Sequence, residues 1–231
     1  MNLEHKVAIV TGVSKGIGLS IAQSLLDKNV KVAGWSRSAP ADLSHENFLF
    51  VETDVANEES VKSAYKHTVS AFGEDIRILI NNAGYGVYGP IDETKTEDWL
   101  GMFNVNVHGI FYCTQAVVPN MKKVEEGHVI NISSIAGLNP VKNMVGYAAT
   151  KHAVTGLSHS LFMELRDFGI KVTCIYPGSV ETNFFDKLEA FGTSSNKMMP
   201  EDIASTVVHC LESNPNYHHV DIEVRPLRPK G

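Results

Sequence analysis

The sequence has few cysteines and no cluster of metal ligands. Its three cysteines, Cys113, Cys174 and Cys210, are far apart and form no C-x-x-C pair. We therefore expect buried free thiols rather than a disulfide framework. The histidines show no ligand spacing with acids or thiols, so we predict no bound metal. The glycosylation sequon Asn131-Ile132-Ser133 falls in a run with the pattern of a buried strand, and we discount it.

Neither sign of charge dominates, and long apolar runs are missing. The chain has 20 bases and 26 acids, a formal net charge of −6, and the two signs are interspersed. A nucleic acid or a membrane is therefore not an expected partner. Apolar strand residues begin at Val7, which leaves no room for a signal peptide, so we expect a cytoplasmic protein. At 231 residues and 43% hydrophobic, the chain suits one domain covering residues 1–231.

Short β-branched runs alternate with longer amphipathic segments along the whole chain. This alternation predicts an α/β fold, with a doubly wound parallel sheet covered on both faces. Ligands of such sheets bind beyond the carboxyl ends of the strands. The expected strands are 7–10, 30–35, 48–51, 76–80, 129–133, 172–176 and 220–224, and the expected helices are 18–26, 58–72, 96–122, 146–167 and 200–211.

A glycine-rich turn joins the first strand to the first helix. It reads Thr11-Gly12-Val13-Ser14-Lys15-Gly16-Ile17-Gly18. Glycines let the backbone approach a diphosphate, and the helix N-terminus supplies free N–H groups and positive potential. The turn is therefore a candidate cofactor site, the alternative being a tight turn without a ligand.

Two other motifs compete with this interpretation. Gly12, Ser14 and Gly16 also satisfy G-x-S-x-G, which favours a serine hydrolase with Ser14 as nucleophile. Too few residues precede Gly12 to supply the oxyanion-hole strand and loop, which makes this the weaker hypothesis. A literal G-x-G-x-x-G spans residues 84–89, but no helix follows it at once, so we interpret it as a flexible wall of the active site.

The second expected strand ends at Ser36-Arg37, where a dinucleotide-binding fold places the adenosine ribose. An acid there binds the 2′-hydroxyl of NAD, whereas an arginine accommodates the 2′-phosphate of NADP. No acid occurs between Val30 and Pro40. With Lys15 in the adjoining turn, Arg37 predicts NADP(H) as the cofactor, the alternative being a solvated surface arginine.

A tyrosine and a lysine lie four residues apart near the start of an expected helix. Tyr147 and Lys151 therefore share one face, and Ser134 ends the preceding strand. Together they predict a proton-transfer site in which the Lys151 ammonium lowers the pKa of Tyr147. Asn104 and Asn106 lie inside the long apolar helix, where asparagine is unfavourable, so we expect an inward role for at least one.

Taken together, the motifs resemble the short-chain dehydrogenase/reductase family over essentially the whole chain. The matching elements are Thr11-Gly12-x-x-x-Gly16-Ile17-Gly18, Asp54-Val55, Asn81-Asn82-Ala83-Gly84, Asn106, Ser133-Ser134, Tyr147-x-x-x-Lys151, and Pro177-Gly178 with Thr182. The resemblance implies a seven-stranded single-domain Rossmann fold with a catalytic tetrad of Asn106, Ser134, Tyr147 and Lys151. It also implies cofactor contacts from Gly12, Ser14, Lys15, Gly16, Ile17, Gly18, Arg37, Asp54, Val55, Asn82, Ala83, Gly84, Tyr147, Lys151, Pro177, Gly178, Val180 and Thr182.

The expected reaction is hydride transfer between the cofactor and a carbonyl or alcohol carbon. Tyr147 would exchange the proton, Ser134 would bind the carbonyl oxygen, and Asn106 would hold a water that links Lys151 to solvent. A cofactor-binding regulator or sensor of the same fold is the alternative. The last strand is followed by Arg225-Pro226 rather than a glycine-rich segment, which disfavours a substrate on acyl-carrier protein.

The substrate side is expected to be apolar. Residues 179–199 are too many for a simple link, so we predict a mobile lid. The partner would be a medium-sized, largely hydrophobic ketone or aldehyde, and relatives lead us to expect a homodimer or homotetramer. The expected substrate residues are Tyr85, Tyr88, Val141, Met144, Phe184, Phe185 and Leu188.

Overall fold

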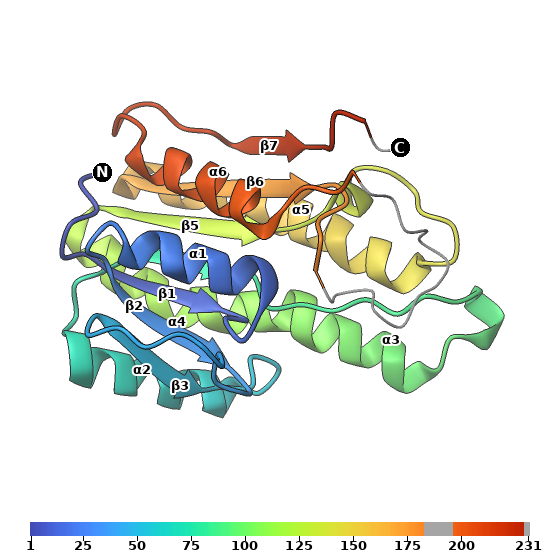
Figure 1. Ribbon diagram of the computed structural model, residues 1–231, viewed down its shortest axis with the longest axis horizontal. Helices are drawn as coiled ribbons and strands as arrows, with labels where there is room; N and C mark the ends of the chain where they lie inside the picture. Colours follow the sequence, from blue (N-terminus) through green and yellow to red (C-terminus); the bar gives the residue numbers. More distant parts are fainter. Residues whose placement is uncertain (183–195, 229–231) are drawn as a thin grey trace.

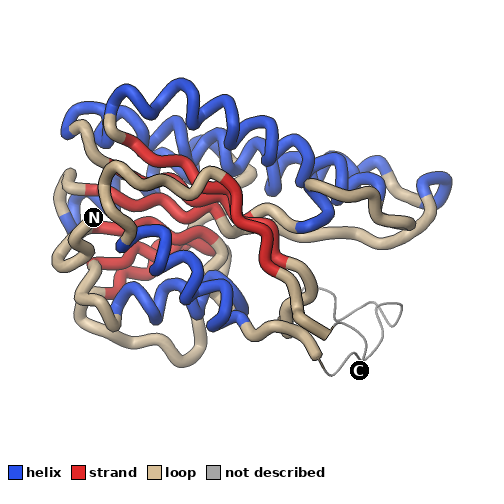
Figure 2. The backbone as a smooth tube through the Cα atoms, turned by 90° about the horizontal axis from the view of Figure 1, so that it is seen from above, coloured by secondary structure: helices blue, strands red, loops and turns tan. Residues whose placement is uncertain are grey.

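The computed structural model describes residues 1–182 and 196–228 and contains one parallel sheet between two layers of helices (Figures 1 and 2). The seven strands lie in the order β3-β2-β1-β4-β5-β6-β7. This order confirms the predicted doubly wound, seven-stranded fold. The strands are β1 (Val7–Thr11), β2 (Lys31–Ser36), β3 (Phe48–Glu52), β4 (Ile76–Asn81), β5 (Gly127–Ile132), β6 (Ile170–Pro177) and β7 (Asp221–Val224).

The helices divide between the two faces of the sheet, as Figure 2 shows from above. Buried side chains of α1 and α6 contribute to one core, and those of α2, α4 and α5 to the other. The α-helices are α1 (Gly16–Leu26), α2 (Glu58–Phe72), α3 (Thr96–Phe103), α4 (Gly109–Val124), α5 (Val145–Leu165) and α6 (Pro200–Glu212). Short 3₁₀ helices are η1 (Ile91–Glu93), η3 (Ile135–Gly137) and η4 (Arg166–Phe168).

Strand β1 shows why the central strands are apolar throughout. Successive side chains point to opposite faces of a sheet. Ala8 and Val10 accordingly pack in one core, while Val7 and Ile9 pack in the other. Because helices cover both faces, every residue of the strand is buried.

The long helix expected over 96–122 is not a regular α-helix, so that prediction was wrong in its middle. A π-helical segment, η2 (Asn104–His108), separates α3 from α4. Such a bulge rotates the side chains that follow it, and π-bulges are frequent at functional sites. Asn106 is thereby buried at 1% exposure, whereas Asn104 remains exposed. The expected inward role thus falls to Asn106.

The cysteine prediction is confirmed, because Cys113, Cys174 and Cys210 are all buried and free. Within the described ranges, no helix has the length and apolar character needed to cross a membrane. The same residues contain no group of three or more potential metal ligands.

Candidate active site

The turn between β1 and α1 has the geometry of an anion cradle. Gly12 and Gly16 adopt the left-handed φ values of 73° and 61°. A Cβ on Gly18 would lie 2.3 Å from the carbonyl oxygen of Gly12, so only glycine fits this close approach. Lys15, at the N-cap of α1, provides no side-chain cap, and the first turn contains no acid. The helix therefore presents uncapped N–H groups and positive potential, which suit the diphosphate of a dinucleotide.

Thr11 and Asn82 join this turn to the end of β4. The Thr11 hydroxyl oxygen accepts hydrogen bonds from the N–H groups of Asn82 (2.9 Å) and Ala83 (3.0 Å). In return, the Asn82 amide donates to the carbonyl oxygens of Thr11 (2.9 Å) and Gly12 (3.2 Å). Strand order reverses between β1 and β4, so this tie lies where a doubly wound sheet opens its crevice. Sequence reasoning left Thr11 out of the site, although its position at the strand end beside Gly12 was a usable signal.

The residues expected near the adenosine surround the ends of β2 and β3. Lys15 and Arg37 are both exposed, and neither forms an ion pair with any residue in the described ranges. Asp54 is exposed, and its carboxylate accepts the N–H of Ala56 at 3.0 Å. Val55 is instead buried, with a methyl group 2.9 Å from where a Cβ on Gly109 would lie. Its side chain therefore packs in the core, so the contact expected with the adenine would have to come from its backbone.

The residues expected at the nicotinamide end follow β6. The Gly178 N–H donates to the carbonyl oxygen of Val224 at 2.8 Å, which orders the chain beyond Pro177. Thr182 lies against the glycine-rich turn, with its methyl group 3.3 Å from the place of a Cβ on Gly16. The fold thus brings together two predicted cofactor residues that are 166 positions apart in the sequence (182 − 16).

Ser134, Tyr147 and Lys151 meet beyond the end of β5. Ser134 caps η3 by accepting the Ala136 N–H at 3.1 Å, and its hydroxyl also hydrogen-bonds the Tyr147 phenol. The Lys151 ammonium lies 5.6 Å from the centre of the Tyr147 ring and donates to the carbonyl oxygen of Ile132 at 2.9 Å. Tyr147 and Lys151 are only 6% and 5% exposed, so both groups work in a partly dehydrated environment.

The expectation that Lys151 lowers the pKa of Tyr147 was wrong for this structure. Burial raises the pKa of Tyr147 to about 12, and the hydrogen bond with Ser134 opposes this rise. Burial lowers the pKa of Lys151 to about 8. Removal from water disfavours the charged form of each group, and it is the largest cause of both shifts. At neutral pH the phenol is protonated, and the lysine remains mostly charged.

Asn106 holds the chain that follows β4. Its carbonyl oxygen accepts the N–H of Tyr85 at 3.0 Å, and its amide donates to the Tyr85 carbonyl oxygen at 2.8 Å. The same amide donates to the Thr150 hydroxyl at 3.0 Å, which links this chain to α5. A Cβ on Gly84 would lie 3.1 Å from the Asn106 carbonyl oxygen and 3.8 Å from the Lys151 nitrogen. Hydrogen bonds thus hold the start of residues 84–89, and the flexibility expected of this wall stays a prediction.

Four of the expected substrate residues gather around Tyr147. Tyr85, Tyr88, Val141 and Met144 pack in one apolar cluster with it. Sequence reasoning missed three further members of this cluster, Val87, Met102 and Ala136, which have no distinctive sequence pattern. The expected substrate residues Phe184, Phe185 and Leu188 lie outside the described residues.

The two ends of the predicted lid are tied to each other. The N–H of Glu181 donates to the Met198 carbonyl oxygen at 2.8 Å, and the Met198 N–H donates to the Ser179 carbonyl oxygen at 3.0 Å. Lys197 and Glu181 add an ion pair at 3.0 Å. Residues 179–182 and 196–199 are therefore anchored, and the remainder of the predicted lid, 183–195, lies outside the described residues.

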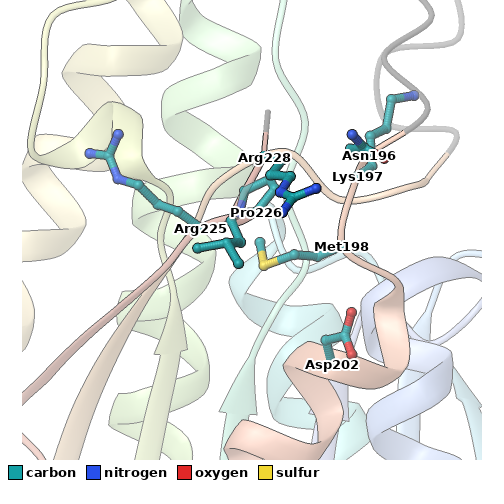
Figure 3. Close-up of a pocket in the computed structure, with 8 residues that line it drawn as sticks. Asn196, Lys197, Met198, Asp202, Arg225, Pro226 and Arg228 are labelled. Atoms are coloured by element: carbon teal, nitrogen blue, oxygen red, sulfur yellow. The ribbon is translucent and has the colours of Figure 1, made fainter. Parts of the chain in front are cut away.

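A surface hollow of about 470 Å³ adjoins these anchored ends (Figure 3). Figure 3 shows the Arg225 side chain directed away from Lys197 and Asp202. Lys197 pairs with Glu181, and Arg225 pairs with Glu223, so most of the positive charge is neutralised. Tyr147 is not among its lining residues, and we assign the hollow no catalytic role. Its lining residues are Asn196, Lys197, Met198, Asp202, Arg225, Pro226, Leu227 and Arg228.

Comparisons with known proteins agree with this geometry. The family model described as short chain dehydrogenase matches residues 6–191. An uncharacterized oxidoreductase of Staphylococcus aureus (strain USA300) is 36% identical, over 97% of this chain and 99% of its own.

Two solved structures have the same fold. A serine dehydrogenase complexed with NADP⁺ superposes with a TM-score of 0.89 at 29% identity, over 94% of both chains. A 3-ketoacyl-(acyl-carrier-protein) reductase from Brucella melitensis complexed with NADH superposes with a TM-score of 0.86 at 27% identity, over 98% of this chain and 99% of its own. With a family model that covers most of its length and a relative similar from end to end, the chain belongs to the short-chain dehydrogenase/reductase family of oxidoreductases.

Proposed function

We propose that the protein is an NADP(H)-dependent oxidoreductase that transfers a hydride between the nicotinamide and a carbonyl or secondary-alcohol carbon. The observation that carries the proposal is the group of Ser134 with the buried Tyr147 and Lys151, which lies at the same carboxyl edge of the sheet as the uncapped start of α1. One element can bind a dinucleotide diphosphate, and the other can supply a proton to an oxygen. Their proximity at one edge of the sheet is what hydride transfer to a carbonyl requires.

The bound cofactor supplies or accepts the hydride, and the chain's own residues manage the oxygen and its proton. Ser134 binds the carbonyl oxygen and polarises it. The Tyr147 phenol is protonated at neutral pH, since its pKa is raised to about 12, and it donates that proton to the developing alkoxide. Lys151 remains mostly charged and stabilises the tyrosinate that this transfer leaves. A protonated phenol is the form that carbonyl reduction requires.

Reprotonation of Tyr147 needs a path to solvent. Lys151 can carry the proton, and its nitrogen and the Asn106 carbonyl oxygen lie 3.8 and 3.1 Å from where a Cβ on Gly84 would be. A water held by Asn106 would connect Lys151 to bulk solvent. The hydrogen bonds from Asn106 to Tyr85 show a second task, because the same residue also orders the wall of the site.

Cofactor choice rests on Arg37 and Lys15. The two solved relatives described above bind NADP⁺ and NADH on the same fold, so the fold alone does not select the cofactor. Both side chains are exposed and are not paired with any described acid, which leaves them available for a 2′-phosphate. Each charge-assisted hydrogen bond contributes about 1.5–3 kcal/mol, so one contact gives at least a tenfold preference for NADPH.

The apolar cluster around Tyr147 favours a medium-sized hydrophobic ketone or aldehyde as substrate. Exposed apolar side chains on α3, α4 and α5, among them Leu100, Phe111 and Met163, support a homodimer or homotetramer. The alternative of a regulator or sensor does not explain why Tyr147 and Lys151 are both buried at the site. The serine hydrolase hypothesis with Ser14 has less support, because the chain belongs to a family of oxidoreductases whose model covers this turn.

The proposal is tested by following NADPH oxidation over a panel of ketones, aldehydes, quinones and hydroxy acids. With the best substrate, Tyr147→Phe should retain less than a tenth of the wild-type rate and bind NADPH as tightly as wild type. Tyr217→Phe is the matched control, because its ring is 58% exposed and belongs to the segment before β7. Retention of more than a tenth of the rate in Tyr147→Phe would exclude Tyr147 as the proton donor.

A further inference from the structure

The segment of residues 84–89 crosses directly over the Tyr147 ring. A Cβ on Gly86 would lie 3.0 Å from a ring carbon of Tyr147, so backbone and ring are in close contact. Asn106 fixes the beginning of this segment through both polar groups of the Tyr85 backbone. The position of its far end therefore decides how much room remains beside the reactive phenol.

Asn143 holds that far end by two separate hydrogen bonds. Its carbonyl oxygen accepts the N–H of Gly89 at 2.8 Å. Its side-chain amide donates to the Tyr88 hydroxyl oxygen at 2.9 Å. A single residue thus binds both the backbone and a side chain of the segment.

The backbone of Asn143 explains why this residue type suits the position. Its φ is +60°, in the left-handed region that asparagine tolerates better than most side chains. Glycine would adopt the same conformation but would lack the amide. Asn143 precedes the first residue of α5 by two positions and Tyr147 by four, so its place is coupled to the helix that carries the phenol.

We propose that Asn143 is a positioning residue that holds Tyr88 and Gly89 at a set distance from Tyr147 and thereby selects which carbonyl substrates fit. The inference rests on the proposed function for its kinetic consequence. The apolar cluster supports it, because Tyr88 packs there with Tyr147, Val141 and Met144. Loss of the amide bond removes one contact that holds the Tyr88 side chain in the cluster around Tyr147, so the ring can shift into the room that a substrate needs. Substrate binding then weakens, while the proton-transfer groups stay in place.

Amide hydrogen exchange tests the clamp without any substrate. Asn143→Gly keeps the backbone conformation and the bond to Gly89 but removes the amide, and Tyr88→Phe removes its partner. Each should speed exchange at residues 87–89 by roughly 2–12-fold, the effect of one neutral hydrogen bond. Asn139→Ala is the matched control, because this nearby exposed amide bonds only within its own turn, to Ile135 at 3.2 Å. Unchanged exchange in Asn143→Gly would overturn the proposal.

Steady-state kinetics tests the positioning role. Asn143→Gly and Tyr88→Phe should each raise KM for the best carbonyl substrate roughly 2–12-fold, with kcat within about twofold of wild type, and the double variant should add little more. Asn143→Asp should have a KM much closer to that of wild type than Asn143→Gly has, because a carboxylate accepts a hydrogen bond from the Tyr88 hydroxyl. That rescue should vanish in the combination with Tyr88→Phe.

The outcomes separate the inference from the proposed function. Faster exchange with an unchanged KM would show that the clamp does not select substrates and would overturn the positioning role. A wild-type protein that turns over no carbonyl with either cofactor would refute the proposed function and the positioning role with it. In that case the exchange data would still decide whether Asn143 holds the segment.

Discussion

Replacing Thr11 by valine is expected to loosen the junction between β1 and β4. Valine has nearly the same shape, so the change removes one hydroxyl and leaves the packing almost intact. The hydroxyl oxygen now accepts two backbone N–H groups, those of Asn82 and Ala83, at 2.9 and 3.0 Å. Thr11 itself is only 2% exposed, so a methyl group there leaves both donors without their partner.

The magnitude follows from the number of donors left unpaired. Each buried unpaired donor costs about 1–3 kcal/mol. Asn82 and Ala83 are only partly buried, which allows some access of water, so we expect a total near the lower part of the range, about 2–4 kcal/mol. For a domain of this size, this loss lowers Tm by roughly 4–16 °C. NADPH affinity should fall as well, because the same tie positions Gly12.

Urea unfolding and calorimetry measure the stability, and fluorescence titration measures NADPH binding. Thr206→Val is the matched control, because its hydroxyl donates only to the Asp202 carbonyl oxygen within α6 and the residue is partly exposed. We expect that control to change stability by less than about 0.5 kcal/mol. A loss below about 1 kcal/mol in Thr11→Val would refute the reasoning, since it would mean that water replaces the hydroxyl without cost.

Three further changes test other parts of the structure. Gly18→Ala should weaken NADPH binding at least about tenfold and destabilise the fold by about 1–3 kcal/mol, because its Cβ meets a backbone oxygen at 2.3 Å. Gly156→Ala, where a Cβ meets nothing within 4 Å, should be neutral or stabilising in the same assays. Arg37→Ala should remove most of the preference for NADPH over NADH, and equal dissociation constants in the wild type would contradict the assignment. Burial lowers the pKa of His128 well below the unfolded value of about 6.5, so its contribution to stability is fully present above that pH and is lost as the pH falls. Urea titrations should show that the free energy of unfolding changes with pH differently in wild type and in His128→Gln. The same pH dependence in both would count against a neutral buried His128.

Much of the fold could be predicted from the sequence, because it depends on patterns among neighbouring residues. Alternating apolar strands and amphipathic helices predict a doubly wound parallel sheet, because each period matches one backbone geometry. The regular-helix expectation over 96–122 failed at η2, since a π-bulge depends on what the inward-turned Asn106 can bind. That partner comes from another part of the chain, and periodicity contains no information about it.

The candidate site, too, could be predicted from the sequence only in part. The glycines of the first turn and the Tyr147-x-x-x-Lys151 spacing were evident from the sequence, because steric freedom and helical periodicity are properties of neighbouring residues. The direction of the Tyr147 pKa, in contrast, is set by burial, which sequence spacing does not measure. The ties of Thr11 to Asn82, of Asn106 to Tyr85 and of Asn143 to Tyr88 join segments 71, 21 and 55 positions apart. Only the packed tertiary structure brings such polar groups within hydrogen-bonding distance, because each needs a partner that its own segment does not contain.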